Sequence, residues 1–167
     1  MADGMPRRPR AGVSGPLVVG VIPNQHPEVV LEARALSDAL NRPIVFAYVE
    51  PNSYLVEWDL KSDIEYLSLH PREIDEDISA DVALILATLW KMMDGAALPW
   101  RFRVLAGDPA KALARLARET RASMIVVGTR EPGAGPLLAE FLGGSTAAHL
   151  AGQQPLPVLV VPAVEAG

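Results

Sequence analysis

The chain has 167 residues, a net charge of −5 at neutral pH and no cysteine, and half of its residues are apolar. This length fits one domain, and the apolar fraction can bury a large core, which excludes a disordered chain. The lack of cysteine excludes disulfides, thiolate metal sites and cysteine nucleophiles. Because the charge balance is acidic and no apolar run reaches the length of a membrane span, we expect a cytoplasmic domain that binds neither nucleic acid nor membranes.

Two segments lack the periodicity of a packed element. Residues 1–15 mix glycine, proline and arginine, so we expect a flexible tail there. Residues 51–75 carry Tyr54, Trp58 and Tyr66 among several acids, and they are longer than most connections between a strand and a helix. This irregular insertion in the predicted domain, residues 16–163, is a candidate lid, small hairpin or oligomer contact, and the pattern does not choose among them.

The first half of the domain alternates between predicted strands and helices. The continuous apolar run Leu17–Ile22 predicts a strand covered on both faces. After a break at Pro23 and Asn24, helical spacing of apolar residues predicts a helix that ends at Asn41. Residues 44–49 predict a second buried strand. The long helical repeat that comes after the insertion comprises Ile78, Val82, Ile85, Leu86, Leu89, Trp90 and Met93.

The second half continues the alternation. Polar and apolar residues alternate over 101–105, which indicates a third strand. Asp108 is placed to cap the next helix, with Pro109 in its first turn and Thr120 on its packed side. Residues 124–127 predict a fourth strand, and residues 158–161 a last one after a helix that begins near Ser145. Five apolar strands separated by helices predict an α/β fold with a doubly wound, five-stranded parallel sheet and helices on both faces.

The segment 128–146 has the composition of an anion-binding loop. Ligands of open parallel sheets bind beyond the carboxyl ends of the strands, where this segment is expected to lie. Its glycines let backbone N–H groups approach an anion, a helix that starts at residues 144–146 favours a phosphate, and an arginine can neutralise charge. An ordinary glycine turn with a serine helix cap is the alternative. The candidate residues are Gly128, Arg130, Gly133, Gly144, Ser145 and Thr146.

The C-terminal third carries a more specific pattern. Residues 144–150 read Gly-Ser-Thr-Ala-Ala-His-Leu, and residues 155–162 read Pro-Leu-Pro-Val-Leu-Val-Val-Pro. Together with the strand 124–128 and the segment Gly107–Ala110, they resemble the universal stress protein family. That family closes with Gly, two residues, Gly, nine residues, and Gly followed by Ser or Thr. The likeness covers about residues 16–162 apart from 51–75, and it is more specific in the C-terminal third than in the N-terminal half.

The resemblance implies a small Rossmann-like fold with strand order 3-2-1-4-5, usually a homodimer formed through the last strand. Some members of the family bind ATP and others do not. The resemblance therefore implies ATP or AMP as a ligand, with Mg²⁺ only if ATP is bound. By the same likeness, Gly128 and Arg130 would lie against the phosphates or ribose, residues 144–146 would hold the phosphates, and Tyr48 would line the adenine pocket.

Two positions differ from the nucleotide-binding members of the family. Ile22 stands where those members have an aspartate that contacts the nucleotide, and Asn24 stands where they have a serine. The second motif glycine is also displaced, because Glu131 follows the arginine and the next glycine is Gly133. Loss of a carboxylate that accepts from the ribose, and a negative charge beside the phosphates, predict weak or variable nucleotide binding.

Other catalytic motifs are missing from the sequence. No Gly-x-Gly-x-x-Gly follows the first strand and no P-loop is present, and Ser145 is not part of a Gly-x-Ser-x-Gly elbow. His26, His70 and His149 lack the short spacings of a metal site. We therefore expect a non-catalytic regulatory domain of the stress response that binds an adenine nucleotide.

Two alternatives of other classes stay open. The domain is an interaction module that has lost nucleotide binding and works through a regulatory protein partner, with residues 51–75 as the candidate surface. Otherwise it is an enzyme that acts on a small phosphorylated metabolite, for which Glu131 is the sole candidate base near the anion-binding loop.

Overall fold

A computed structural model describes residues 14–50, 76–129 and 155–162, and it describes the side chains of the second range from residue 80 onward. The expected tail up to residue 13, the insertion 51–75 and the helix expected near Ser145 lie outside the described residues. None of the described helices is long and apolar enough to cross a bilayer. In chain order, the elements are β1 (Leu17–Gly20), α1 (Glu28–Leu40), β2 (Ile44–Glu50), α3 (Glu76–Met92), β3 (Trp100–Ala106), α4 (Pro109–Glu119), β4 (Met124–Gly128) and β5 (Val158–Val161).

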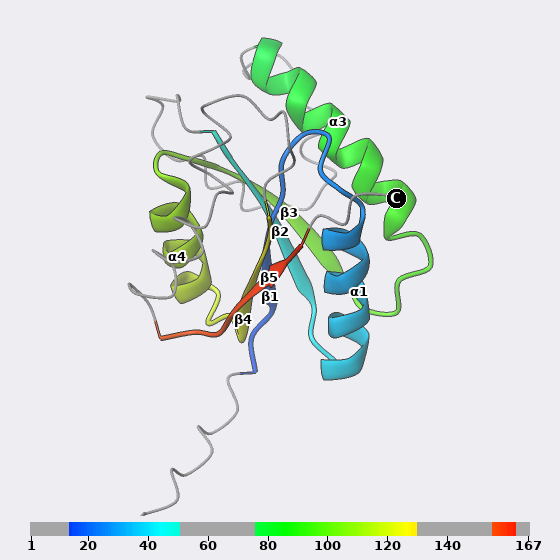
Figure 1. Ribbon diagram of the computed structural model, residues 1–167, viewed down its shortest axis with the longest axis vertical. Coiled ribbons are helices and arrows are strands. Elements are labelled where there is room, and N and C mark those ends of the chain that lie inside the picture. Colours follow the sequence, from blue (N-terminus) through cyan, green and yellow to red (C-terminus); the bar gives the residue numbers. More distant parts are fainter. Residues whose placement is uncertain (1–13, 51–75, 130–154, 163–167) are drawn as a thin grey trace, which may run out of the picture.

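The five strands form one parallel sheet in the order β3-β2-β1-β4-β5, which confirms the expected fold class and strand order (Figure 1). β1 lies at the centre, where Leu17 is opposite Ile44 of β2 and Met124 of β4. The strand ends at Gly20, earlier than the apolar run predicts. The Val21 N–H nevertheless donates to the Ala47 carbonyl at 2.9 Å, so the extended course continues toward the loop.

The helices form two layers, with α1 and α3 on one face of the sheet and α4 on the other (Figure 1). Successive residues of a strand point to opposite faces. In β1, Val18 therefore packs in the core under α4, and Val19 packs in the core under α1 and α3. Both side chains are fully buried. This is why the central strands are apolar without alternation, as expected for a parallel sheet covered on both faces.

The predicted helix ends are confirmed where a local signal specifies them. Asp108 caps α4, since its Oδ1 accepts from the Lys111 N–H at 2.9 Å, and Pro109 occupies the first helical position. Asn41 ends α1 in the left-handed conformation, with φ of 53°. Thr120 was expected on the packed side of α4. It is the C-cap residue of that helix.

The long repeat forms α3 as predicted, but among its described side chains Trp90 is not in the core. Leu89 is buried, whereas Trp90 is 54% exposed and packs edge-to-face on Trp100 of β3, with ring centroids 5.1 Å apart. The end of α3 is tied to α1, because Arg34 Nη1 donates to the Met92 carbonyl at 2.8 Å. The contact with Trp100 places Trp90 outside the core, between α3 and the edge strand β3.

Candidate functional site

The strand order reverses between β1 and β4. The chain leaves β1 through α1 to reach β2 on one side, while β4 lies on the other side of β1 and is reached through α4 on the opposite face. In open α/β sheets, ligands bind in the crevice at the carboxyl ends of the strands at such a reversal. The candidate site is therefore the space between the end of β1, the loop 21–27 and the end of β4.

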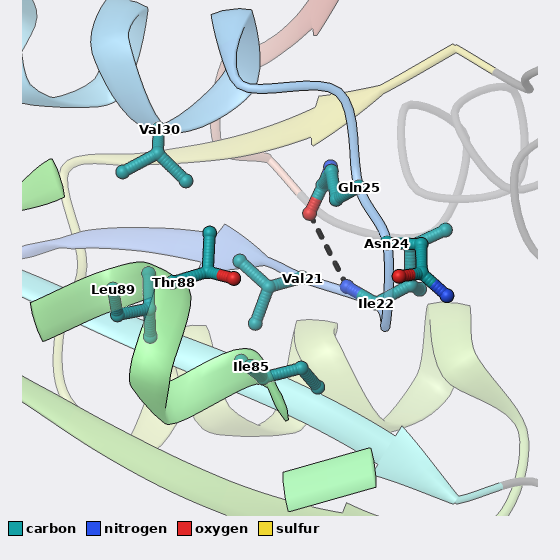
Figure 2. Close-up of a pocket in the computed structure, with 8 residues that line it drawn as sticks. All are labelled: Val21, Ile22, Asn24, Gln25, Val30, Ile85, Thr88 and Leu89. Atoms are coloured by element: carbon teal, nitrogen blue, oxygen red, sulfur yellow. Dashed lines mark hydrogen bonds between the residues drawn. The ribbon is translucent and has the colours of Figure 1, made fainter. Parts of the chain in front are cut away.

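The loop 21–27 is held by short-range hydrogen bonds. The Ile22 N–H donates to Gln25 Oε1 at 3.2 Å, which bends the Gln25 side chain back over the end of β1 (Figure 2). Asn24 is exposed and has a φ of 54°, a conformation that asparagine tolerates better than most residues. Pro27 is the N-cap residue of α1, and the carbonyl of His26 accepts from the Val29 N–H at 3.3 Å. The loop therefore has a specified conformation that leads directly into α1.

Gly128 ends β4 against this loop. A Cβ placed on Gly128 would lie 2.8 Å from Val29 Cγ2 and 3.0 Å from Gln25 Nε2, closer than non-bonded atoms normally approach. The Thr129 N–H donates to the Val161 carbonyl at 2.8 Å, so pairing with β5 continues just beyond the strand end. Only glycine permits this close approach of β4 to the first turn of α1 without displacing its neighbours.

Tyr48 lies on β2, one strand away from the reversal. Its buried hydroxyl is 2.9 Å from Glu50 Oε2 and 3.1 Å from Asp81 Oδ2, and it can donate its one proton to either carboxylate. Burial first, and then the neighbouring Glu50 and Asp81 carboxylates, raise the pKa of Tyr48 far above its ordinary value. The phenol is therefore neutral at physiological pH, and its hydroxyl links the end of β2 to α3.

A small hollow lies beside the loop, between β1, α1 and α3 (Figure 2). Its volume of about 20 Å³ is enough for roughly one water molecule. Pockets for small organic ligands measure about 300–1,000 Å³. Between these residues the structure therefore leaves no space for a nucleoside. The residues that line the hollow are Val21, Ile22, Asn24, Gln25, Val30, Ile85, Thr88 and Leu89.

The structure brings some of the predicted site residues together. Ile22 and Asn24 lie in the loop after β1, and Gly128 lies across the reversal from them at the end of β4. Tyr48 does not line the hollow, and its hydroxyl is engaged by two carboxylates. The remaining candidates lie outside the described residues and stay predictions: Arg130, Gly133, Gly144, Ser145 and Thr146.

Sequence reasoning gave no role to Gln25, whose side chain accepts from the Ile22 N–H after β1 and has its amide nitrogen near Gly128 of β4. One feature of the sequence could have indicated this residue. Gln25 comes three residues after Ile22, and a polar side chain at that distance can accept a hydrogen bond from the backbone N–H that follows the strand. Composition and motif spacing give no weight to such a residue. Its closeness to Gly128 depends on the pairing of β1 with β4, which joins segments about a hundred residues apart in the chain.

The described part of the site offers hydrogen-bonding groups and apolar walls. Within residues 14–50, 76–129 and 155–162, no three His, Asp or Glu side chains are grouped so that they could hold a metal ion. His26 Nδ1 accepts from the Glu28 N–H at 3.4 Å, which occupies that nitrogen in the start of α1.

Comparison with known proteins identifies the fold family. The family model described as the universal stress protein family matches residues 16–162. A universal stress protein from Archaeoglobus fulgidus superposes with a TM-score of 0.62 at 19% identity, covering 88% of this chain and 98% of that chain. The same archaeon's universal stress protein in complex with dAMP gives a TM-score of 0.59 at 18% identity, covering 89% and 98%.

A further solved structure is a universal stress protein in complex with cAMP, with a TM-score of 0.55 at 20% identity, covering 90% of this chain and 99% of that chain. No curated protein matches this chain by sequence. At these identities the solved structures show a shared fold, and the family model spans nearly the whole predicted domain. The chain belongs to the universal stress protein family.

Proposed function

We propose that this chain binds an adenine nucleotide, ATP or AMP, weakly or variably, and acts as a non-catalytic cytoplasmic regulator in a stress response. The observation that carries the proposal is the approach of Gly128 to the loop 21–27 at the strand reversal, in a chain of the universal stress protein family. Family members of the same fold have been solved in complex with cAMP and dAMP, which supports a nucleotide as the ligand class.

The proposed binding energy comes mainly from the phosphates. The Ile22 side chain has no group that could accept from a ribose hydroxyl, and it is almost fully buried. The phosphates would then be held by the predicted loop, Arg130 and Gly133 with residues 144–146, through N–H groups and one positive charge. Mg²⁺ would accompany ATP as the counterion of its triphosphate, and AMP would need none.

The first experiment is to denature the purified protein and identify any released nucleotide by chromatography and mass spectrometry. ATP or AMP near one per chain would support the proposal. Isothermal titration with AMP, ATP, cAMP and GMP then gives affinity and base preference. No heat with any adenine nucleotide at millimolar concentration would contradict the proposal, and steady turnover of ATP by the pure protein would contradict its non-catalytic part.

A paired substitution locates the site. Gly144→Asp adds bulk and negative charge to the predicted phosphate loop, so we expect it to abolish nucleotide binding while the protein stays folded. Ala39→Asp adds the same charge at an exposed position near the far end of α1 and should leave affinity unchanged. Retained affinity in the Gly144 variant would place the site elsewhere.

The proposed assembly is a homodimer through β5. This strand is at the edge of the sheet, and Val160 on it is 40% exposed. An edge strand presents backbone groups to a second chain. We expect light scattering to give twice the monomer mass of 17.9 kDa, and Val160→Lys to shift the protein toward the monomer. A monomeric wild-type protein at micromolar concentration would rule this interface out.

The second candidate function is an interaction module that has lost nucleotide binding. The observation that favours it is the outer side of α3, where Leu84 is 42% exposed and Ala83 and Ala87 are exposed beside it. Exposed contiguous apolar side chains are typical of protein interaction sites. On this hypothesis, Leu84→Glu should abolish capture of a regulatory partner and leave nucleotide binding as it is. Unchanged capture by that variant would argue against this surface.

A further inference from the structure

The outer side of α3 carries an apolar surface. Five of the side chains that the structure describes there are apolar and exposed: Ala80, Ala83, Leu84, Ala87 and Trp90. Residues three and four positions apart are neighbours on the surface of a helix, so these side chains adjoin one another. Trp90 ends the surface on the side of β3, through its edge-to-face contact with the edge strand. Contiguous exposed apolar side chains of this kind are typical of a surface that another molecule covers.

The polar residues of this surface do not prevent it from being covered. Thr88 Oγ1 donates to the Leu84 carbonyl at 3.0 Å, so the hydroxyl keeps its hydrogen bond inside the helix when water is removed. Lys91 lies in the last turn of α3, at the end of the surface, where its long side chain can keep the ammonium group in water. Neither residue therefore adds a buried polar group without a partner.

Charged and apolar residues follow a symmetric spacing along α3. Asp77, Ala80, Leu84, Ala87 and Lys91 are separated by three, four, three and four positions, a spacing that stays on one side of a helix. Leu84 is at the centre, with an acidic residue seven positions before it and a basic residue seven positions after it. A second helix in the reverse direction presents a lysine to each aspartate, whereas one in the same direction presents like charges. The row is therefore complementary to itself in the antiparallel orientation.

We propose that the outer side of α3 binds α3 of a second copy of this chain, with the two helices antiparallel and Leu84 at the two-fold axis. In such an interface the same surface is used by both copies, so each Leu84 packs on the other and each Lys91 faces an Asp77. This inference goes beyond the proposed function and needs no nucleotide. It uses a surface other than the β5 edge, so dimers formed through β5 would be joined through α3 into larger assemblies.

The pairing is expected to be weak. One side of a single helix is smaller than the standard protein interface of about 1,200–2,000 Å², so we expect a dissociation constant on the order of 100 µM. A weak contact of this kind is best detected by trapping it covalently. The chain contains no cysteine, so a single introduced thiol can form a disulfide only with the same position of another copy.

The first test compares three single-cysteine variants under a mild oxidant on non-reducing gels: Leu84→Cys, Ala80→Cys and Arg118→Cys. Leu84→Cys should form the cross-linked dimer at least about tenfold faster than the other two, because only position 84 meets itself at the axis. In the antiparallel pair, the two residues at position 80 are about 12 Å apart along the helices, beyond the Cα separation of about 7 Å that a disulfide can span. Arg118→Cys, exposed on α4, gives the rate of random collision.

The second test exchanges the charges. Sedimentation equilibrium is measured in a Val160→Lys background, so that association through β5 does not contribute. Lys91→Glu should weaken self-association by about two- to tenfold, because both opposite-charge pairs become like-charge pairs. Adding Asp77→Lys should restore it. Both exchanges oppose the helix dipole, so an effect on helix stability alone would become worse in the combined variant instead of being rescued.

Each of the other outcomes overturns the inference. Equal cross-linking of Leu84→Cys and Arg118→Cys would show that α3 does not meet a second copy. Fast cross-linking of Ala80→Cys as well would exclude the antiparallel pair, and a combined charge variant without rescue would exclude the register. Loss of a different protein partner in Leu84→Glu, with cross-linking at position 84 no faster than collision, would assign the surface to that partner. None of these results depends on whether the chain binds a nucleotide.

Discussion

α3 and α4 cover opposite faces of the same sheet, yet they expose different side chains. The outer side of α4 carries charge, with Lys111 and Arg118 exposed. Among the side chains of α3 that the structure describes, from residue 80 onward, the exposed ones are mostly apolar, and they include Leu84 and Trp90. Burial against the sheet explains the inner side of both helices, because each must cover apolar strands. The outer sides do not pack against the sheet, so burial does not explain the exposed apolar side chains of α3. Such a surface is more typical of an interaction site than of a solvent-exposed helix.

The two helices also differ in what specifies their position. α4 begins at a local signal, the Asp108 cap followed by Pro109. α3 is positioned by long-range hydrogen bonds, from Tyr48 to Asp81 and from Arg34 to the end of the helix. A local cap acts as soon as the helix forms, whereas the long-range bonds exist only in the assembled sheet. Substitutions at these points test whether the two layers are equally stable.

The largest expected effect is in the core under each helix. Leu89 of α3 is 1% exposed and Leu113 of α4 is fully buried, so Leu89→Ala and Leu113→Ala should each lower the free energy of unfolding by about 2–5 kcal/mol. Urea denaturation measures both. Leu84→Ala, on the outer side of α3, is the control and should lose far less. A loss under about 1 kcal/mol for either core variant would mean that its layer is loosely packed.

The next effect concerns the link between β2 and α3. Tyr48→Phe removes a buried hydroxyl that faces two carboxylates, so we expect it to lower the free energy of unfolding by about 1–3 kcal/mol in urea denaturation at neutral pH. Because phenylalanine keeps the aromatic ring, the measured loss reports the hydrogen bonds of the hydroxyl and not the packing of the ring. No loss would show that the Tyr48 hydroxyl does not fix α3.

The same tyrosine predicts alkaline behaviour. The pKa of Tyr48 is raised in the folded protein, so above pH 10 the unfolded chain loses a proton that the folded chain keeps. The free energy of unfolding should therefore fall with rising pH above about 10, by up to roughly 1.4 kcal/mol per pH unit from this residue. Unfolding measured between pH 9 and 11 should show a shallower slope for Tyr48→Phe. Equal slopes would mean that Tyr48 ionises in the folded state as easily as in the unfolded chain.

A smaller effect is expected at the start of α4. Asp108→Ala leaves the Lys111 N–H without its side-chain acceptor and should lower the free energy of unfolding by about 0.5–2 kcal/mol. Asp108→Asn keeps an acceptor oxygen and should retain most of the stability. Urea denaturation of the two variants distinguishes the loss of the capping hydrogen bond from the loss of the negative charge of Asp108. Equal losses for both variants would assign the effect to the charge of Asp108.

The smallest effect on stability is expected on the outer sides. Leu84→Gln on α3 and Arg118→Gln on α4 should each change the free energy of unfolding by no more than about 0.5 kcal/mol, since both side chains are exposed. Thermal unfolding measures this, and gel filtration at high concentration shows whether Leu84→Gln alone reduces self-association. A large loss of stability for Leu84→Gln would show that this surface is covered in the folded protein.

The elements were largely predictable, and the site was predictable only in part. Apolar runs and helical spacing identify the described strands and helices, because burial of one side of an element leaves a period in the sequence. The same reasoning placed Trp90 with the core of α3, although it lies at the margin, because a period does not show where the sheet ends. Ile22, Asn24 and Gly128 were found at the reversal, whereas Gln25 carried no composition signal.

The sequence by itself determined the strands, the helices and their local caps, since each depends on residues a few positions apart. The family pattern near the C-terminus also indicated the strand order. Only the tertiary structure decided that Gln25 meets Gly128 and that Tyr48 meets Asp81. These pairs come from strands and helices that are distant in the chain, and their contact depends on which strands pair and in which register. Local propensity contains no information about such contacts.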